Sequence, residues 1–527
     1  MLFWTANRES VRRTPVPSEF VATHIEVAGV TAALLAVAAV ALWIQLRIYP
    51  NHDVAWVLWG ARAMMHGAKF GRDIIEPNPP LAWYLSMPTD AIAEWLNVPL
   101  DRPFRIALAL LGVLSAASLV RLRPAGLSVW RASIVAVVAA LGMIVLVGRE
   151  YGQRDPITII LALPYLALAG RQCDGDPVPT RTARVMIGVV AGLGFALKPY
   201  FLAVPLLVEL SLMAFGRKPR RLFRAENLSA AGVIIAYAVW LVAFEQPYLR
   251  DVIPLVIPIY GAFSYPFVDV AVPMALQILC AAGFVVLSIE KTDGFGLVLS
   301  ASLCGFAISY LIQEGYAYHL VPARTVALLL ATRFMVDARC SRIVRLTGLG
   351  FATLLVFLWG LPFREWWAVA RPGGALYAQI EDIDTSIARH ARGGSFLVVA
   401  VRTYPSFPAG IYAPARYVSR TNGQWFLPAV VQARHKGDPS PSAETHARDF
   451  IMYDLRSRPT LVLIDTDSRG HTRGPADFDF LKFYEEDPKF RAVWRNYREV
   501  EPVASFRQFV RIDSTGADVR VRRTTPK

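Results

Sequence analysis

The feature that most constrains this chain is a series of long apolar runs in its first two thirds. A helix needs about 20 apolar residues to cross the hydrocarbon core of a bilayer, and eleven runs approach or exceed that length. They cover residues 25–48, 103–120, 131–148, 156–170, 184–197, 199–215, 228–245, 270–289, 294–312, 319–336 and 344–362. The sequence therefore predicts a polytopic α-helical membrane protein with about eleven transmembrane helices.

The composition changes at the end of the last run. About 14% of residues 1–362 are charged, whereas about 27% of residues 363–527 are, close to the roughly 25% of soluble proteins. The tail has strand-like segments at residues 398–401, 461–464 and 506–512, and helical periodicity at residues 375–391, 444–457 and 476–496. We predict a transmembrane domain over residues 1–362 and a soluble α/β domain over residues 363–527.

Lysine and arginine are distributed unevenly between the two sets of short loops. One set, together with the N-terminal segment, carries 18 of them and the opposite set carries 8. Because cytoplasmic loops carry the positive excess, the N-terminus is predicted in the cytoplasm and the tail outside. In a bacterium this describes a multi-pass protein of the inner membrane with a periplasmic C-terminal domain. The net charge of +14 thus reflects membrane orientation, and we do not expect a nucleic-acid partner.

The first outer loop, residues 49–102, is too polar to cross the membrane and is rich in Trp and Tyr. Aromatic side chains mixed with scattered charge are typical of helices that lie in the membrane interface. We expect two such helices, at residues 53–67 and 79–97.

The strongest candidate for chemistry is Asn51-His52-Asp53, at the outer end of the first span. A carboxylate beside hydrocarbon is costly unless it is paired or functional. The simpler alternative is that Asp53 caps the next helix, since Asp is a favoured N-cap. His52 and Asp53 could hold a divalent metal, but one His beside one Asp is a weak signal and the sequence requires no metal.

Two further outer segments contain charged residues. Glu76 and Asn78 begin a proline-rich turn that leads to Tyr84, and a plain turn is the alternative interpretation. The second segment contains Arg149, Arg154 and Asp155. Arginines bind phosphate oxygens in a bidentate manner, and Asp155 could be a second catalytic carboxylate. Here the alternatives are a solvated loop and a helix cap.

The last candidates are polar residues near the ends of later spans. They are Lys198, Gln313, His319 and Arg324. A lysine at such a position often only extends to the interface, and a lone histidine is often structural. An arginine inside a span is, however, a functional hypothesis by default.

The predicted topology places all of these segments on the same outer face. A single site there would combine carboxylates with fixed cations at the depth of the lipid headgroups. That combination suits an attack on a lipid-linked group activated by phosphate.

At this point the sequence resembles a known family. Asp53 just after the first span, a long first outer loop with paired interfacial helices and Pro79-Pro80-Leu81 are similar to the GT-C membrane glycosyltransferases. The resemblance is to the branch with the protein mannosyltransferases and the aminoarabinose transferase of lipid A, and it covers about residues 25–345. In this chain Val54 follows Asp53 where the family often has Glu, and Asn78 stands where the family often has Lys.

The resemblance implies a GT-C fold and a sugar transfer on the outer membrane face. The donor would be a polyprenyl-phosphate sugar, and the acceptor a hydroxyl of a glycolipid, envelope polysaccharide or protein. Transfer would invert the anomeric carbon, with Asp53 as general base. The departing phosphate would be stabilised by Arg149, Arg154, Lys198, His319 or Arg324. No cofactor would be required, although a divalent metal could bind through Asp53, His52 and Asp155.

Two other functions also fit a many-helix protein with polar groups. One is a transporter or flippase for a lipid-linked saccharide, although no inverted repeat is evident and the polar residues gather at one face. The other is a polymerase or ligase of envelope polysaccharide, for which we would expect the largest outer loop later in the chain. In the tail, Tyr404, Tyr412, Tyr417 and Trp425 could stack on sugars or belong to the core.

Overall fold

The computed structural model describes residues 17–216, 222–260, 266–288, 294–313, 316–404, 406–467 and 478–512. Eight of the basic residues that entered the prediction of orientation lie outside these residues: Arg8, Arg12, Arg13, Arg217, Lys218, Arg220, Arg221 and Lys291.

Each of the eleven apolar runs coincides with a helix of the bundle. These are α1 (Pro17–Gln45), α4 (Asp101–Arg121), α5 (Val129–Ala140) with η1 (Leu141–Val145), α6 (Arg154–Cys173), α7 (Arg181–Ala196), η3 (Pro199–Leu202) with α8 (Ala203–Gly216), α9 (Ala225–Phe244), α11 (Phe267–Ser288), α12 (Gly294–Ile312), η7 (Ala317–Leu320) with α13 (Val321–Val336), and α14 (Arg342–Ala370). Seven stretches of the described chain are long and apolar enough to cross a membrane, and three further apolar helices are shorter. The predicted helical membrane domain is therefore confirmed.

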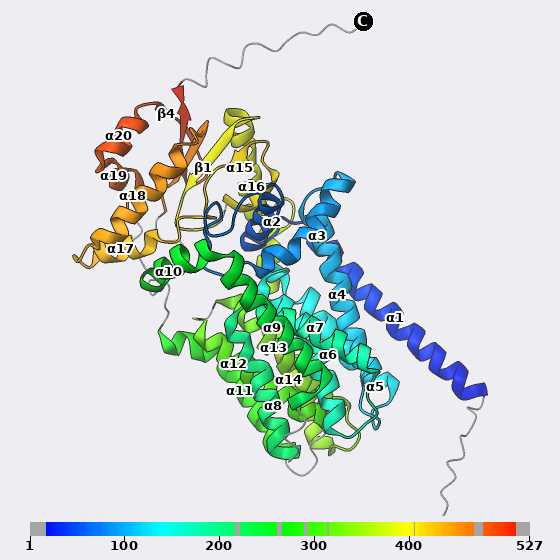
Figure 1. Ribbon diagram of the computed structural model, residues 1–527. Coiled ribbons are helices and arrows are strands. Elements are labelled where there is room, and N and C mark those ends of the chain that lie inside the picture. Colours follow the sequence, from blue (N-terminus) through cyan, green and yellow to red (C-terminus); the bar gives the residue numbers. More distant parts are fainter. Residues whose placement is uncertain are drawn as a thin grey trace, which may run out of the picture.

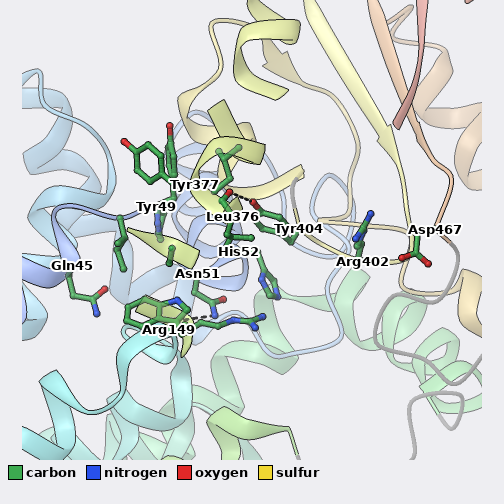
Figure 2. A pocket seen from close by; sticks show the side chains of 15 residues that line it. Gln45, Tyr49, Asn51, His52, Arg149, Leu376, Tyr377, Arg402, Tyr404 and Asp467 are labelled. Atoms are coloured by element: carbon green, nitrogen blue, oxygen red, sulfur yellow. Dashed lines mark hydrogen bonds between the residues drawn. The ribbon is translucent and has the colours of Figure 1, made fainter. Parts of the chain in front are cut away.

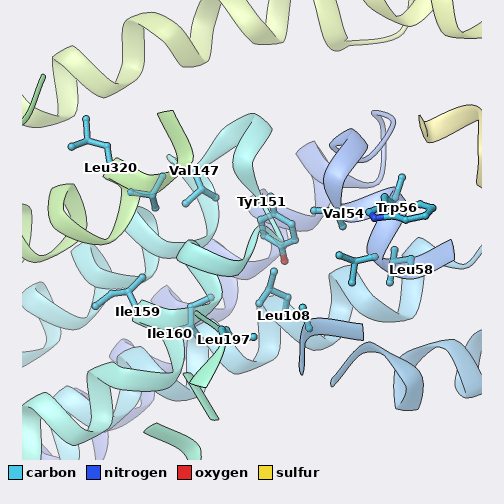
Figure 3. Packing of buried hydrophobic residues seen from close by; sticks show 14 of the residues in the cluster. Val54, Trp56, Leu58, Leu108, Val147, Tyr151, Ile159, Ile160, Leu197 and Leu320 are labelled. Carbon is cyan, nitrogen blue, oxygen red and sulfur yellow. The ribbon is translucent and has the colours of Figure 1, made fainter. Parts of the chain in front are cut away.

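The bundle is held together by close packing of apolar side chains and by small residues where helices meet. Ile159 and Ile160 of α6 lie in one buried cluster with Leu108 of α4 (Figure 3). Gly188 of α7 faces α9 so closely that a Cβ there would come within 2.1 Å of the Glu226 carbonyl oxygen. Glycine at such a position allows two helix backbones to approach, which is how helices associate in a lipid environment.

The first outer loop folds into α2 (His52–Met65) and α3 (Leu81–Leu96), close to the two helices expected there. Arg62 of α2 and Asp90 of α3 form an ion pair at 2.7 Å. The aromatic face of α2, however, is covered by protein, because Trp56 is 1% exposed and packs against Phe407 of the C-terminal domain. Of the Trp residues expected at the interface, Trp95 on α3 is 82% exposed and is available to a bilayer.

The C-terminal domain contains a mixed five-stranded sheet, as an α/β domain requires. Its strands are β1 (Ser395–Val399), β2 (Arg416–Tyr417), β3 (Leu461–Asp465), β4 (Tyr497–Val503) and β5 (Phe506–Arg511), in the order β2-β1-β3-β5-β4. The first three strands of that order are parallel, and the β4–β5 hairpin pairs antiparallel to β3. The three expected strands match β1, β3 and β5, while β2 and β4 were not predicted.

The helices of this domain agree with the sequence in part. They are α15 (Ala375–Ala391), α16 (Ser406–Tyr412), α17 (Leu427–His435), α18 (Pro441–Leu455), α19 (Phe480–Glu485) and α20 (Pro488–Trp494). The single helix expected at residues 476–496 is divided by Pro488, which starts α20 behind an Asp487 cap. The spanning helix α14 also continues past the expected boundary at residue 362, as far as Ala370.

The C-terminal domain sits on the end of the bundle that carries α2, and α1 begins at the far end (Figure 1). Short elements complete the chain between the spans: η2 (Gly148–Glu150), η5 (Tyr248–Val252) and α10 (Ile253–Tyr260). The amide of Ile75 donates a hydrogen bond of 2.7 Å to the carbonyl of Arg420, which ties the first outer loop to the C-terminal domain. This arrangement encloses space between the two domains, and the candidate site lies there.

Candidate active site

A cavity of about 310 Å³ lies between the ends of the spans and the C-terminal domain. Its wall contains three carboxylates and two arginines, so charged groups are concentrated there. The charged and imidazole side chains are those of Asp53, Glu76, Glu150, Arg149, Arg154 and His52. The membrane-domain wall is completed by Asn51, Pro77, Asn78, Gln153, Tyr316, Ala317 and Tyr318. The C-terminal domain contributes Val401, Thr403, Asn422 and Trp425. Both domains therefore build the site.

Asp53 lies in the first turn of α2 with its carboxylate at the cavity. The capping role is taken by Asn51, whose side-chain oxygen accepts a hydrogen bond from the Asp53 amide at 2.9 Å. The carboxylate accepts a hydrogen bond from Gln153 Nε2 at 3.1 Å and lies 3.6 Å from His52 Nε2. Because Asn51 already caps the helix, the interpretation of Asp53 as an N-cap is wrong.

Glu150 is a second carboxylate at the cavity, which the sequence analysis did not select. It accepts a hydrogen bond from Asn51 Nδ2 at 3.2 Å, and Arg149 Nε lies 4.0 Å away. Burial raises the pKa of Glu150, Arg149 opposes the shift and the neighbouring charge of Asp53 adds to it, and together these causes bring the pKa to about 7. This carboxyl group therefore titrates near neutral pH beside Asp53.

Arg154 and Glu76 form the deep part of the cavity wall. Both side chains are almost completely buried, and Arg154 Nη1 lies 3.6 Å from Glu76 Oε1. Glu76 also accepts hydrogen bonds from the indole of Trp56 at 2.9 Å and from the side chain of Asn78 at 2.6 Å. Arg154 Nη1 is buried without a hydrogen-bond partner in the described part of the chain. A guanidinium with an unused donor is suited to an anion.

Arg149 stands at the boundary between this cavity and a second one. Its side chain is 48% exposed, and its backbone carbonyl accepts a hydrogen bond from Asn51 Nδ2 at 3.2 Å (Figure 2). The second cavity has a volume of about 250 Å³ and shares Asn51, His52 and Arg149 with the first. The two cavities thus meet beside Asp53.

Asp155, Lys198 and Gln313 form a buried cluster, but none of them lines the cavity. Lys198 Nζ lies 2.8 Å from Asp155 Oδ2 and 2.6 Å from Gln313 Oε1. Asp155 has no exposed surface. The expectation that Asp155 is a catalytic carboxylate is therefore not supported, because its charge is neutralised by Lys198. Asp155 directly follows Arg154 in the chain, so this cluster adjoins the cavity wall at Arg154 without lining the cavity.

Three other predicted residues also lie outside the cavity wall. His319 is buried against the ring of Tyr318, at 4.1 Å between centroids. Arg324 is partly buried in α13 and interacts with Tyr310 of α12. Tyr84 of α3 donates its hydroxyl to Glu245 at the end of α9. Among the described residues, no group of three or more His, Cys, Asp or Glu side chains could hold a metal ion.

Besides Glu150, the sequence analysis missed Gln153 and the side chains from the C-terminal domain. Gln153 could have been selected because it lies between Glu150 and Arg154 in a segment already singled out. Thr403 and Asn422 carried no signal, since a soluble domain has many such residues. Of the four aromatics considered for sugar stacking, Trp425 lines the first cavity and Tyr404 the second. Tyr417 is 2% exposed and belongs to the core.

No protein-family model matches the chain, and no curated protein matches its sequence. Solved structures do resemble it. ArnT from Cupriavidus metallidurans in the apo state is 15% identical, and the match covers 94% of this chain and 99% of that one with a TM-score of 0.48.

Two structures of an oligosaccharyltransferase from Archaeoglobus fulgidus are also similar. The complex with Zn and sulfate is 13% identical over 90% of this chain and 72% of that one, with a TM-score of 0.46. The complex of AglB with an inhibitory peptide and a dolichol-phosphate is 12% identical over 90% and 74%, with a TM-score of 0.47. We therefore infer the function from the side chains of the site.

Proposed function

We propose that this protein is a membrane glycosyltransferase that moves a sugar from a polyprenyl-phosphate donor to an acceptor hydroxyl. The observation that supports the proposal best is the placement of Asp53 with Arg149 and Arg154 in one cavity at the end of an apolar bundle. A base for the acceptor and cations for a leaving phosphate are the two requirements of such a transfer.

The transfer would be a single displacement that inverts the anomeric carbon. Asp53 takes the proton of the acceptor hydroxyl while the hydroxyl oxygen of the acceptor forms a bond to the anomeric carbon. The bond between that carbon and the phosphate oxygen breaks, and the lipid phosphate leaves with the electron pair. General-base assistance of this kind contributes about 10²–10⁴-fold to the rate.

Arg154 and Arg149 would stabilise the charge that develops on the departing phosphate. Arg154 is held in place from two sides, by Glu76 at 3.6 Å and by the face of the Trp83 ring at 5.8 Å. Donors fixed in a site that excludes water stabilise a transition state without reorganising at the moment of reaction. No metal is needed in this scheme, although His52 and Asp53 could contribute two ligands to one.

The proposed location is the inner membrane of a bacterium, with the N-terminus in the cytoplasm and the C-terminal domain in the periplasm. The excess of positive charge in the loops at the other end of the bundle supports this orientation. The acceptor would be a glycolipid, an envelope polysaccharide or a protein, reached from the outer leaflet.

The test is the variant Asp53→Asn in the purified full-length protein. It should reduce release of the lipid phosphate from a panel of radiolabelled polyprenyl-phosphate sugars by at least about 10²-fold. The matched control is Asp73→Asn, in the same outer loop, where Arg72 pairs with the carboxylate outside the cavity. Near-normal release by Asp53→Asn would contradict the proposal, and transbilayer movement of an intact donor by the wild type would favour a flippase.

A further inference from the structure

The second cavity is the feature of the molecule that the proposed chemistry does not use. Besides the wall that it shares with the first cavity, it is lined by the aromatic rings of Tyr49, Tyr377, Tyr404 and Trp366. Tyr49 follows the first span, and Tyr377 lies in α15. Tyr404 lies in the segment after β1, and Trp366 lies near the end of α14. As in the first cavity, both domains contribute (Figure 2).

The tyrosines of this cavity are held in place but are not core residues. The ring centroids of Tyr49 and Tyr377 lie 4.9 Å apart, and the Tyr404 hydroxyl donates a hydrogen bond of 3.0 Å to the Leu376 carbonyl. All three tyrosines are only partly buried, unlike Tyr417 in the core. Burial raises the pKa of Tyr404, so its hydroxyl stays protonated at physiological pH. Rigid, partly exposed rings of this kind are suited to contact with a ligand.

The charges around the cavity are largely balanced. Arg402 makes a bidentate ion pair with Asp465, at 2.7 and 3.0 Å, so its charge is neutralised within the C-terminal domain. Asp467 adds an acidic side chain to the wall, opposite in sign to Arg149. An anionic group would find no excess of positive charge here. A neutral sugar would find ring faces for its C–H surface and amide, guanidinium and carboxylate groups for its hydroxyls.

The position of the cavity relative to Asp53 suits an acceptor. In an inverting displacement the nucleophile approaches from the side opposite the leaving group. Arg154, the more buried of the two cations proposed to stabilise the phosphate, lines the first cavity and not the second, so we place the departing phosphate in the first cavity. Asn51 and His52, which directly precede Asp53, form the wall between the two cavities. A saccharide bound in the second cavity would therefore extend its hydroxyl past Asn51 and His52 toward Asp53, which lines the first cavity.

We infer that the second cavity binds the terminal sugar ring of a saccharide acceptor. This inference rests on the proposed function and narrows it, because a glycan or a sugar-bearing lipid headgroup is then favoured over a protein side chain. A volume of about 250 Å³ suits one ring more than an extended chain.

The first experiment measures binding without any donor. Saturation-transfer NMR would use the full-length protein in nanodiscs with methyl glycosides of mannose, galactose and arabinose as probes. We expect transfer from aromatic protons to at least one probe, and at least about tenfold weaker binding in Tyr377→Ala and Tyr404→Ala. Tyr453→Ala is the matched control, since Tyr453 is exposed on the C-terminal domain, away from both cavities. No signal with any probe, or equal binding by all variants, would overturn the inference.

The second experiment separates this inference from the proposed function. In transfer assays with a saccharide acceptor, Tyr404→Ala should raise the acceptor KM and leave the donor KM unchanged. Tyr404→Phe keeps the ring and loses only the bond to Leu376, so it should restore most of the acceptor affinity. Tyr404→Phe also guards against misfolding of the alanine variants. Donor cleavage with an unchanged acceptor KM would reject the saccharide site and retain the transferase. Probe binding without any donor cleavage would retain the site and reject the transferase.

Discussion

The two ends of the helical bundle both contain clusters of charge, but the clusters are built differently. At the end opposite the C-terminal domain, Glu226 pairs with Arg184 at 2.8 Å and with Arg224 at 3.3 Å. There Arg224 also contacts Glu209, which accepts the Tyr165 hydroxyl at 2.7 Å. At the other end, Asp53, Glu150 and Arg149 line a cavity and keep part of their surface exposed. Charge in an apolar bundle thus marks a candidate site only where it faces open space.

The same contrast separates two aspartates at the site end. Asp155 is fully buried and is matched by Lys198 at 2.8 Å, whereas the side chain of Asp53 is 22% exposed at the cavity. A buried, paired carboxylate cannot take a proton from a ligand without first losing its partner. Asp53 lines the cavity with part of its surface exposed, which is why the proposed base is Asp53.

The largest effect that would test this contrast is expected at the closed cluster. Glu226→Gln removes a charge that is 1% exposed and leaves Arg184 and Arg224 without their shared partner. Breaking a buried pair on one side costs about 3–5 kcal/mol. We expect a lower melting temperature in detergent and a smaller yield of folded protein. Donor cleavage per folded molecule should stay normal. Loss of donor cleavage in well-folded Glu226→Gln would show that this buried cluster also contributes to activity, which contradicts the contrast between the two ends.

A somewhat smaller effect, on activity instead of stability, is expected at the cluster that lines the cavity. Arg154→Gln removes one of the two cavity cations and should lower kcat for donor cleavage by about 10²–10³-fold. Its measurement is single-turnover release of the lipid phosphate, with the melting temperature recorded in parallel. Arg123→Gln, at the far end of the bundle, is the matched control, since its side chain bonds a backbone carbonyl there. Equal kcat in the two variants would remove Arg154 from the proposed chemistry.

The fold could be predicted from the sequence because its signals are local. Eleven apolar runs became helices, and the periodicity at residues 375–391 matched α15. The strands β2 and β4 were missed because β2 has only two residues and β4 is mostly exposed, so neither shows a buried apolar pattern. The burial of Trp56 was missed because it depends on docking of a distant domain.

The site could be predicted only as a set of segments on one face. Loop membership brought Asp53, Glu76, Arg149 and Arg154 to one end of the bundle, and the structure places all four at one cavity. Loop membership could not show that Lys198 would form an ion pair with Asp155, because that pairing depends on how α6 and α7 pack side by side. Periodicity and charge counts describe where a residue lies along a helix, but not which neighbour it meets.

The smallest effect expected is a pH dependence that depends on Glu150. Its pKa is raised to about 7, mainly by burial. Below that pH the group is neutral, and above it a second negative charge stands beside Asp53, increasing the proton affinity of the base. Donor cleavage should therefore rise with pH through about 7, by roughly tenfold or less, since one pKa unit corresponds to a factor of ten.

Glu150→Gln is the variant that isolates this effect. It keeps the size of the side chain and should flatten the pH profile around 7. The profile of Glu94→Gln should keep its inflection, because Glu94 pairs with Arg62 and His66 outside the cavity. Stability gives an independent measurement. Because the folded pKa lies above the ordinary value, the wild type should lose stability as pH rises through about 7. The melting temperature of Glu150→Gln should not show that loss. An unchanged inflection in Glu150→Gln would assign the titration to another group of the cavity.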